Sequence, residues 1–282
     1  MDIKVYDHDT VLSILPDRKP ESHKGNFGRI LLLCGSEGYT GAAALSAMGA
    51  LRSGAGLVYV GVPRSIYAIE AVKLTEAIVF PLANSKGMFS GRTCKQINQH
   101  LDNKDAVLIG PGIGKSKGCE QLVLHILKNY HGPLVLDADG INLICNHKDV
   151  LRGRTFPTVI TPHLGEFSRL GGVVTDDKCH DAINMANDLN CIMLLKGHHT
   201  IVTDGKQCVS IQTGNPGMAT GGSGDVLAGV ITSLIGQGID CLEATACAAW
   251  LAGAAADRCA EKIGQYGMLP SDVIMELPRL MK

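Results

Sequence analysis

Aromatic residues, net charge and long apolar runs are all scarce in this chain. Phe, Trp and Tyr make up 4% of its 282 residues, which argues against a surface on which nucleic-acid bases stack. The formal net charge of −1 lacks the basic excess typical of nucleic-acid-binding proteins. No apolar stretch approaches the roughly 20 residues of a membrane span, and the acidic N-terminal segment MDIKVYDHDTVLSIL is unlike a signal peptide. We therefore expect a cytoplasmic globular protein with no nucleic-acid or membrane partner.

Paired cysteine motifs are missing as well. The ten cysteines are dispersed, no two are spaced as C-x-x-C, and none forms a zinc-finger-like set with histidine. Several lie inside apolar runs, such as Cys34 in ILLLCG and Cys247 in TACAAW. Because the cytosol keeps thiols reduced, we expect all ten to be free thiols with a structural role, and no zinc site.

What the sequence does contain is a regular alternation of short apolar runs and longer helical stretches. Most of the runs are continuously apolar, as strands covered on both faces should be. Strand-then-helix repetition predicts an α/β fold with a mostly parallel central sheet and helices on both faces. Only DGKQ separates the last two runs, so the C-terminal edge of the sheet should be antiparallel. No linker or repeat divides the chain, and we expect residues 1–282 to form a single domain.

The expected elements can be placed on the sequence. The predicted strands are Arg29–Cys34, Leu57–Val62, Ala106–Ile109, Leu134–Leu136, Thr158–Ile160, Cys191–Lys196, Thr200–Thr203 and Cys208–Ile211. The predicted helices are Gly41–Ser53, Lys117–Lys128, Asp176–Leu189, Asp225–Gly236 and Leu242–Lys262.

Glycine is abundant, at 34 residues, and many glycines fall where a predicted strand ends or a helix begins. The loop IGPGIGKS resembles a P-loop, but a P-loop has four residues between its first glycine and the Gly-Lys pair. Only three separate Gly110 from Gly114-Lys115. A dinucleotide fingerprint fails as well, because its third glycine would fall at Lys115. An NAD-dependent oxidoreductase therefore remains a weak alternative.

A second glycine-rich loop, NPGMATGGSGDVLAG, leads into an apolar helix expected to begin at Asp225. Gly221, Gly222 and Gly224 free the backbone to wrap around an anion, and N–H groups at a helix N-terminus bind phosphate oxygens. The same helix dipole should keep the Asp225 carboxylate ionised, as a general base requires. The structural alternative is that Asp225 only caps its helix.

The third polar loop, LLKGHHT, lies between two predicted strands. Its lysine supplies a point charge for phosphate and its threonine a hydroxyl, although taken alone the segment is also a polar hairpin turn.

Together these segments resemble the NAD(P)H-hydrate dehydratases of the ribokinase-like superfamily. The resemblance covers nearly the whole chain, in the family's order. Its blocks are Lys24–Ala47, Leu108–Gly114, LVLDADGIN at Leu134–Asn142, TPHLGEFSRL at Thr161–Leu170, Leu194–Thr200 and Gly214–Gly229. Leu164, Gly140 and Ser223 depart from the residues usual in the family, without removing a polar group that the chemistry needs.

The resemblance implies roles for particular residues. It places Ala42, Gly114, His163 and Asp225 against a cofactor hydrated at C6. Against the nucleotide it places the glycine loop and the third polar loop, with the residues Lys196, Gly197, His198, His199, Thr200, Gly222 and Gly224.

It also implies a reaction. The C6 hydroxyl is phosphorylated while Asp225 accepts its proton, the ring nitrogen lone pair then expels phosphate, and loss of a C5 proton restores NADH or NADPH. Mg²⁺ is the expected cofactor, with ADP or ATP as donor, and the absence of a transit peptide or fused epimerase domain favours ADP. Asp137 and Asp139 could support Mg²⁺ through water, but no metal ligand is assigned. Because family members often form tetramers, we expect a homo-oligomer.

Two other functions share parts of this pattern. A vitamin-precursor kinase of the same superfamily would share the GGSGD block and yield a stable phosphorylated product. A nucleotide sensor without catalysis would not need Asp225.

Overall fold

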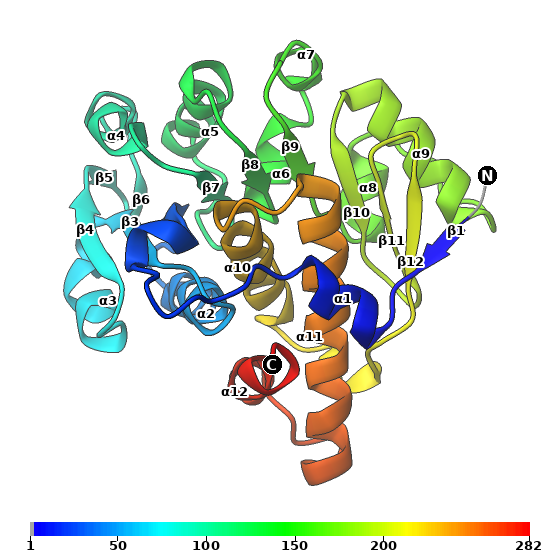
Figure 1. Ribbon diagram of the computed structural model, residues 1–282. Helices are drawn as coiled ribbons and strands as arrows, with labels where there is room; N and C mark the ends of the chain where they lie inside the picture. Colours follow the sequence, from blue (N-terminus) through cyan, green and yellow to red (C-terminus); the bar gives the residue numbers. More distant parts are fainter. Residues whose placement is uncertain (1–2) are drawn as a thin grey trace.

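A computed structural model describes residues 3–282. Its main feature is a ten-stranded sheet in the order β1-β12-β11-β10-β9-β8-β7-β2-β3-β4 (Figure 1). These strands are β1 (Ile3–Val5), β2 (Arg29–Leu33), β3 (Leu57–Pro63), β4 (Ile78–Leu82), β7 (Ala106–Ile109), β8 (Leu134–Leu136), β9 (Thr158–Ile160), β10 (Ile192–Leu195), β11 (Thr200–Thr203) and β12 (Cys208–Ile211). A separate small antiparallel sheet pairs β5 (Asn84–Ser85) with β6 (Met88–Phe89).

The sheet is parallel from β10 to β4, whereas β11 is antiparallel to both β10 and β12. This confirms the predicted α/β fold and its antiparallel C-terminal edge. One strand at this edge was not predicted: β1 pairs in parallel with β12 and forms the outermost strand of the sheet.

Strand side chains alternate between two cores, one on each face of the sheet. Along β2, Ile30 and Leu32 belong to one core while Leu31 and Leu33 belong to the other, and all four are fully buried. Because helices cover both faces, neither set of side chains needs to be polar. This explains why the strands are apolar at every position rather than at alternate ones.

Helices cover both faces of the sheet. One face is covered by α2 (Thr40–Arg52), α10 (Ser223–Gly236), α11 (Cys241–Ile263) and α12 (Pro270–Leu280), with α1 (His8–Ile14) and α3 (Tyr67–Lys73) near them (Figure 1). The other face is covered by α4 (Thr93–Leu101), α5 (Lys117–Asn129), α6 (Asp139–Ile144), α7 (Lys148–Arg152), α8 (Leu164–Arg169) and α9 (Lys178–Leu189).

Two glycines allow α2 and α10 to pack at very short distance. A Cβ on Gly49 would lie 2.7 Å from the carbonyl oxygen of Val226, and one on Gly229 would overlap the carbonyl oxygen of Ser46. Neither backbone can move easily, so both positions require glycine. This contact fixes the first half of α10, which carries Asp225, against the middle and C-terminal half of α2.

The predicted strands and long helices agree with the structure to within about two residues, while several short elements were not predicted. Edge strand β4 contains Pro81, a residue that disfavours a strand assignment and is tolerated mainly at sheet edges. Edge strand β1 has three residues, all exposed. Within residues 3–282, no helix combines the length and apolar character needed to cross a membrane.

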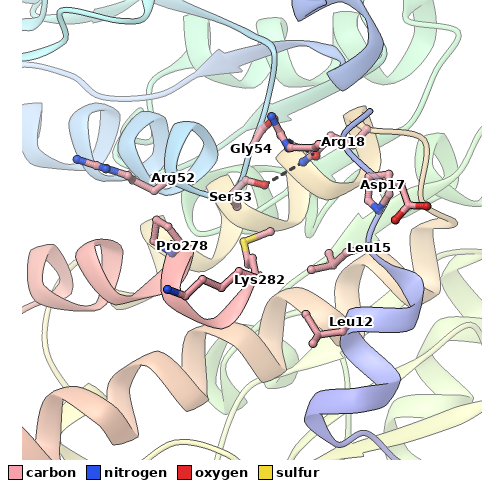
Figure 2. A pocket seen from close by; sticks show the side chains of 12 residues that line it. Leu12, Leu15, Asp17, Arg18, Arg52, Ser53, Gly54, Pro278 and Lys282 are labelled. Carbon is pink, nitrogen blue, oxygen red and sulfur yellow. Dashed lines mark hydrogen bonds between the residues drawn. The ribbon is translucent and has the colours of Figure 1, made fainter. Parts of the chain in front are cut away.

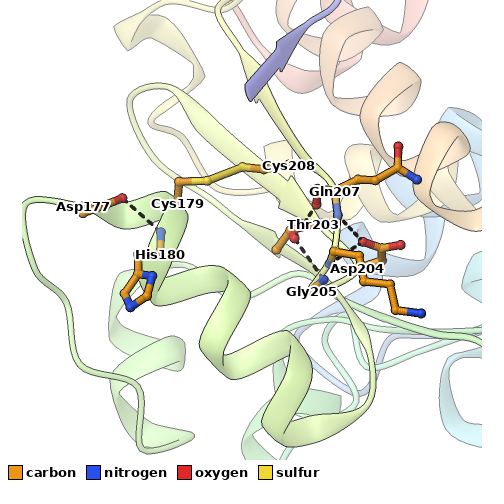
Figure 3. Close-up of a disulfide and its surroundings, with 9 residues drawn as sticks. Asp177, Cys179, His180, Thr203, Asp204, Gly205, Gln207 and Cys208 are labelled. Carbon is orange, nitrogen blue, oxygen red and sulfur yellow. Dashed lines mark hydrogen bonds between the residues drawn. A yellow bond between two sulfur atoms is a disulfide. The ribbon is translucent and has the colours of Figure 1, made fainter. Parts of the chain in front are cut away.

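The cysteine prediction was wrong for one pair. Cys179 in the first turn of α9 and Cys208 at the start of β12 form a disulfide (Figure 3), while the remaining eight cysteines are free. These two cysteines are 29 residues apart in the sequence, and only the packing of α9 against the sheet brings their Cα atoms within 6.9 Å. Cysteine spacing could therefore not reveal the pairing.

Candidate functional site

The glycine-rich and polar loops lie at one edge of the sheet. Parallel strands β2, β7, β8, β9 and β10 are neighbours, so the segments that follow them meet at their shared carboxyl edge. In an open α/β sheet this edge is where ligands bind. The start of α10 reaches the same edge, because Gly224 lies beside the residues that directly follow β8 and β10.

Asp225 lies in the first turn of α10 and does not cap it. The helix begins at Ser223, two residues earlier than expected, after Gly222 as the N-cap residue, and no side chain makes a capping hydrogen bond. Gly222 has φ of +101°, a left-handed conformation that glycine adopts without strain. A Cβ there would also contact Leu45 of α2, at 2.5 Å from Cδ1. The alternative that Asp225 only caps its helix is therefore not supported by the structure.

Burial changes the proton affinity of Asp225. Removal from water is the largest cause, followed by the negative charge of Asp137, and together they raise the pKa of Asp225 to about 7 against a smaller opposing effect of Lys196. The expectation that the helix dipole keeps this carboxylate fully ionised is therefore wrong near neutral pH. A carboxylate with a pKa near the working pH is well suited to accept a proton.

Lys196 follows β10 and forms an ion pair with Asp137, which follows β8. The Nζ of Lys196 lies 2.8 Å from Oδ1 of Asp137, whose side chain is 2% exposed. The same oxygen accepts a hydrogen bond from the Thr161 hydroxyl at 2.6 Å. A Cβ on Gly224 would lie 3.4 Å from the Lys196 Nζ, which places the ammonium group beside the glycine-rich loop.

The loops expected to hold the hydrated substrate also lie together. A Cβ on Gly112 would lie 2.7 Å from the Cβ of Ala42 at the start of α2, and the carbonyl oxygen of Gly112 accepts a hydrogen bond from Ser36 at 2.7 Å. Gly114 has φ of +79°, and its N–H donates to Oδ2 of Asp139 at 3.0 Å. Hydrogen bonds thus hold Gly112 and Gly114 in place, and Gly112 lies against Ala42 at one end of the site.

His163 acts as the N-cap of α8. Its Nδ1 accepts hydrogen bonds from the N–H groups of Gly165 and Glu166 at 3.0 and 3.3 Å, and the Glu166 carboxylate accepts one from the His163 N–H. The histidine side chain is 55% exposed, whereas that of Glu166 is 6% exposed. Glu166 therefore has a capping role, while one edge of the His163 ring faces solvent at the carboxyl edge of β9.

In the third polar loop, LLKGHHT, which is expected to bind the nucleotide, Lys196 and the two histidines lie in different surroundings. His198 and His199 are exposed and, with Ile201, line an open pocket of about 560 Å³, whose other wall is formed by residues 176–179 at the start of α9. Lys178 of that wall donates a hydrogen bond to the carbonyl oxygen of His198 at 3.3 Å, and Thr200 donates to that of Gly197 at 3.2 Å. The two histidines therefore face α9, while Lys196 faces Asp137 and Gly224.

A further pocket of about 530 Å³ lies at the C-terminal ends of α2 and α10, away from the start of α10 that carries Asp225 (Figure 2). The C-terminal ends of α1, α2, α10 and α12 meet there, and Arg18, Arg52 and Lys282 are among its lining residues. Helix C-termini carry partial negative charge, which these cations neutralise. Arg18 also donates to the carbonyl oxygen of Gly54. This pocket is accounted for by helix packing.

The donor groups near the carboxyl edge show how the site could accommodate Mg²⁺. Within residues 3–282 no group of three or more His, Cys, Asp or Glu side chains is placed to hold a metal ion. Asp137 and Asp139 already accept hydrogen bonds from Lys196 and Gly114. The site therefore fits Mg²⁺ that arrives bound to nucleotide phosphates, as magnesium commonly does, rather than a resident ion.

The sheet order and the carboxyl-edge site define the class of protein. The structure superimposes on a ribokinase-like superfamily protein from Enterococcus faecalis with a TM-score of 0.88 and 27% identity, over 99% of this chain and 95% of that one. The fold is therefore ribokinase-like.

The sequence comparisons identify the family. The sequence pattern of the NAD(P)H-hydrate dehydratase family matches residues 30–279, and the chain belongs to this family. An ADP-dependent (S)-NAD(P)H-hydrate dehydratase from Staphylococcus aureus is 32% identical over 97% of this chain and 96% of its own. The ADP/ATP-dependent NAD(P)H-hydrate dehydratase from Bacillus subtilis, co-crystallised with ATP and Mg²⁺, is 29% identical with a TM-score of 0.85, over 99% of this chain and 98% of that one.

Other relatives are longer. The bifunctional NAD(P)H-hydrate repair enzyme Nnr from Moorella thermoacetica is 39% identical over 96% of this chain but only 52% of its own length. The chain thus spans about half the length of several curated relatives that it matches.

Proposed function

We propose that this protein uses ADP or ATP to dehydrate the S form of hydrated NADH and NADPH, restoring the reduced cofactor with release of phosphate and AMP or ADP. Family membership supports the reaction class. The observation that carries the assignment to this site is the position of Asp225. Its half-buried carboxylate makes no capping hydrogen bond and lies at a helix N-terminus, beside Lys196 and a glycine-rich loop. That arrangement combines a proton acceptor with groups that bind phosphate.

In this proposal Asp225 accepts the proton of the C6 hydroxyl as the hydroxyl oxygen attacks the terminal phosphorus of the nucleotide. Gly222 and Gly224 let the backbone N–H groups approach the transferred phosphoryl group, and Lys196 neutralises part of its charge. The bond between C6 and the phosphorylated oxygen then breaks and releases phosphate, as the ring nitrogen lone pair forms a C=N bond to C6. Loss of the C5 proton gives the dihydronicotinamide.

The remaining loops would bind the two substrates. We assign Ala42, Gly114 and the exposed edge of His163 to the hydrated cofactor. Gly197, His198, His199 and Thr200 are assigned to the nucleotide. Mg²⁺ would enter with the phosphates and screen their charge, and residues 1–282 would act as a single catalytic domain.

One assay tests the proposal against a kinase of the same fold. Purified protein is incubated with hydrated NADH and Mg²⁺ together with ADP or ATP, while NADH absorbance and free phosphate are followed. We expect both to rise in equal amounts, with ADP supporting the faster reaction. A stable phosphorylated vitamin precursor, formed without any effect on hydrated NADH, would instead identify a kinase.

We further propose a cytoplasmic homo-oligomer, for which a tetramer is the form we expect. Exposed apolar side chains at the end of α11 and in and around α12 support a contact between copies. Ile263, Tyr266, Leu269 and Met275 are each more than half exposed. Light scattering of the purified protein tests the oligomeric state, and a monomer at micromolar concentration would contradict it.

A further inference from the structure

The segment that follows β8 contains a buried charge to which the proposed reaction assigns no role. Asp137 is 1% exposed, yet both of its short side-chain contacts are polar groups at the carboxyl edge of the sheet, Lys196 of the nucleotide loop and Thr161 after β9. A buried carboxylate is costly unless it is paired, so the pair with Lys196 needs both partners. Two separate loops are therefore tied together beneath the glycine-rich loop.

The backbone at this point is strained. Ala138 has φ of +48° and ψ of −115°, a conformation that is strained for a residue with a Cβ. The turn directs the two flanking carboxylates to different loops, Asp137 to Lys196 and Asp139 to the N–H of Gly114. Strain of this kind persists only where the surroundings hold it, and here both neighbours of Ala138 are held by hydrogen bonds.

Three titratable groups that follow different strands lie near Asp225. Asp137 lies beyond β8, Lys196 beyond β10 and the buried thiol of Cys34 beyond β2. The charge of Asp137 raises the pKa of Asp225, and the charge of Lys196 lowers it. The Cys34 thiol is neutral, because burial, followed by the charge of Asp225, raises its pKa well above the ordinary value.

We propose that Asp137 is a positioning residue that holds the Lys196 ammonium group beside the glycine-rich loop and sets a negative charge next to Asp225. It acts through these two residues and need not touch either substrate. Without Asp137, the Lys196 ammonium group on its flexible four-carbon stem would lose the partner that holds it beside the glycine-rich loop, and Asp225 would lose the neighbouring negative charge. This inference rests on the proposed function for its catalytic consequence, but not for its effect on Asp225 or on nucleotide binding.

The test is the isosteric substitution Asp137→Asn, measured in two ways that do not require turnover. Carbon NMR of the Asp225 carboxyl group follows its titration without substrate, and calorimetry measures the affinity for nucleotide with Mg²⁺. We expect the midpoint of the Asp225 titration to fall by roughly one pH unit or more, because the neighbouring negative charge of Asp137 is lost. Nucleotide affinity should fall roughly tenfold, or about 1.4 kcal/mol. In the dehydration assay the acid limb of kcat should move to lower pH by the same amount.

Two further variants separate positioning from a general structural effect. Asp139→Asn alters the same turn on the side of Gly114, and should raise the KM for hydrated NADH without moving the Asp225 titration. Lys196→Met removes the opposite charge and should move the titration upward. It also tests the pair if Asp137→Asn fails to fold, which circular dichroism would reveal.

The possible results give distinct conclusions. An unchanged Asp225 midpoint in both Asp137→Asn and Lys196→Met, with folded protein, overturns the inference. A uniform loss of kcat at every pH, without a shift of the acid limb, overturns it as well. If the wild type restores no NADH, the proposed function fails, whereas the NMR and calorimetric results still decide the role of Asp137.

Discussion

The substitution Asp225→Asn separates the two consequences of burying this carboxylate. Asparagine keeps the size of the side chain but cannot accept the hydroxyl proton. A positioned general base contributes roughly 10²–10⁴-fold, so kcat should fall by that factor. Binding of nucleotide should change little, because the backbone N–H groups of the glycine-rich loop remain in place.

Stability should change in the opposite direction. A pKa raised to about 7, in place of about 4 in the unfolded chain, penalises the ionised carboxylate by about 4 kcal/mol. Because the folded pKa is the higher one, the unfolded chain releases its proton first as pH rises. The contribution of about 4 kcal/mol that the protonated Asp225 makes to the free energy of unfolding is therefore lost progressively between about pH 4 and pH 7. Above pH 7 this contribution is gone.

Asparagine carries no such penalty. We expect the melting temperature of Asp225→Asn to exceed that of the wild type by on the order of 10 °C at pH 8 and by clearly less at pH 5. Wild-type activity should rise with pH through an apparent pKa of about 7 and reach a plateau above it, because only the ionised form accepts a proton.

The assay is restoration of NADH absorbance from hydrated NADH between pH 5 and pH 9, with thermal unfolding in the same buffers. Asp240→Asn is the matched control. Asp240 also stands at a helix start, but its side chain caps α11 by accepting from the N–H groups of Leu242 and Glu243. Because Asn caps about as well as Asp, this control should be near wild type in both measurements.

Two results would refute this reasoning. Near-normal turnover by Asp225→Asn would falsify its assignment as the base. An equal melting temperature of variant and wild type at both pH 5 and pH 8 would show that burial does not raise the pKa of Asp225.

Three other predictions concern residues outside the reacting groups. Lys115→Ala should keep kcat within roughly tenfold of wild type, about 1.4 kcal/mol, because this exposed lysine does not sit in a P-loop, and a loss of three orders of magnitude would contradict that. Gly229→Ala should lower the free energy of unfolding by about 1–3 kcal/mol in urea titrations, because the added methyl group overpacks the contact between α2 and α10. Gly41→Ala, whose methyl group would meet open space, is its control and should change stability much less. Thiol titration of denatured, unreduced protein should find the eight free cysteines, rising to ten after reduction of the Cys179–Cys208 bond, and ten before reduction would show that this bond is absent.

The fold class and the position of the main loops follow from local patterns in the sequence. Continuous apolar runs such as Ala106–Ile109 can be buried only on both faces of a sheet, and their alternation with helices dictates parallel strands. Parallel strands place their following loops at one edge, and the resemblance to the dehydratases assigned Lys196 and the glycine-rich loop to one nucleotide site. Edge strands β1 and β4 were not predicted, because short, exposed or proline-containing segments lack that apolar signal.

Which side chains meet, and what charge they carry, depends on how distant parts of the chain pack together. The pairing of Asp137 with Lys196 joins residues 59 positions apart, and no local pattern encodes it. The raised pKa of Asp225 arises from burial by neighbouring elements, which outweighs the local helix dipole on which the sequence argument relied. The Cys179–Cys208 bond likewise depends on how α9 packs against the sheet. Local sequence specifies periodicity and turn chemistry, whereas desolvation and through-space charge depend on groups that are distant in the chain and adjacent only after folding.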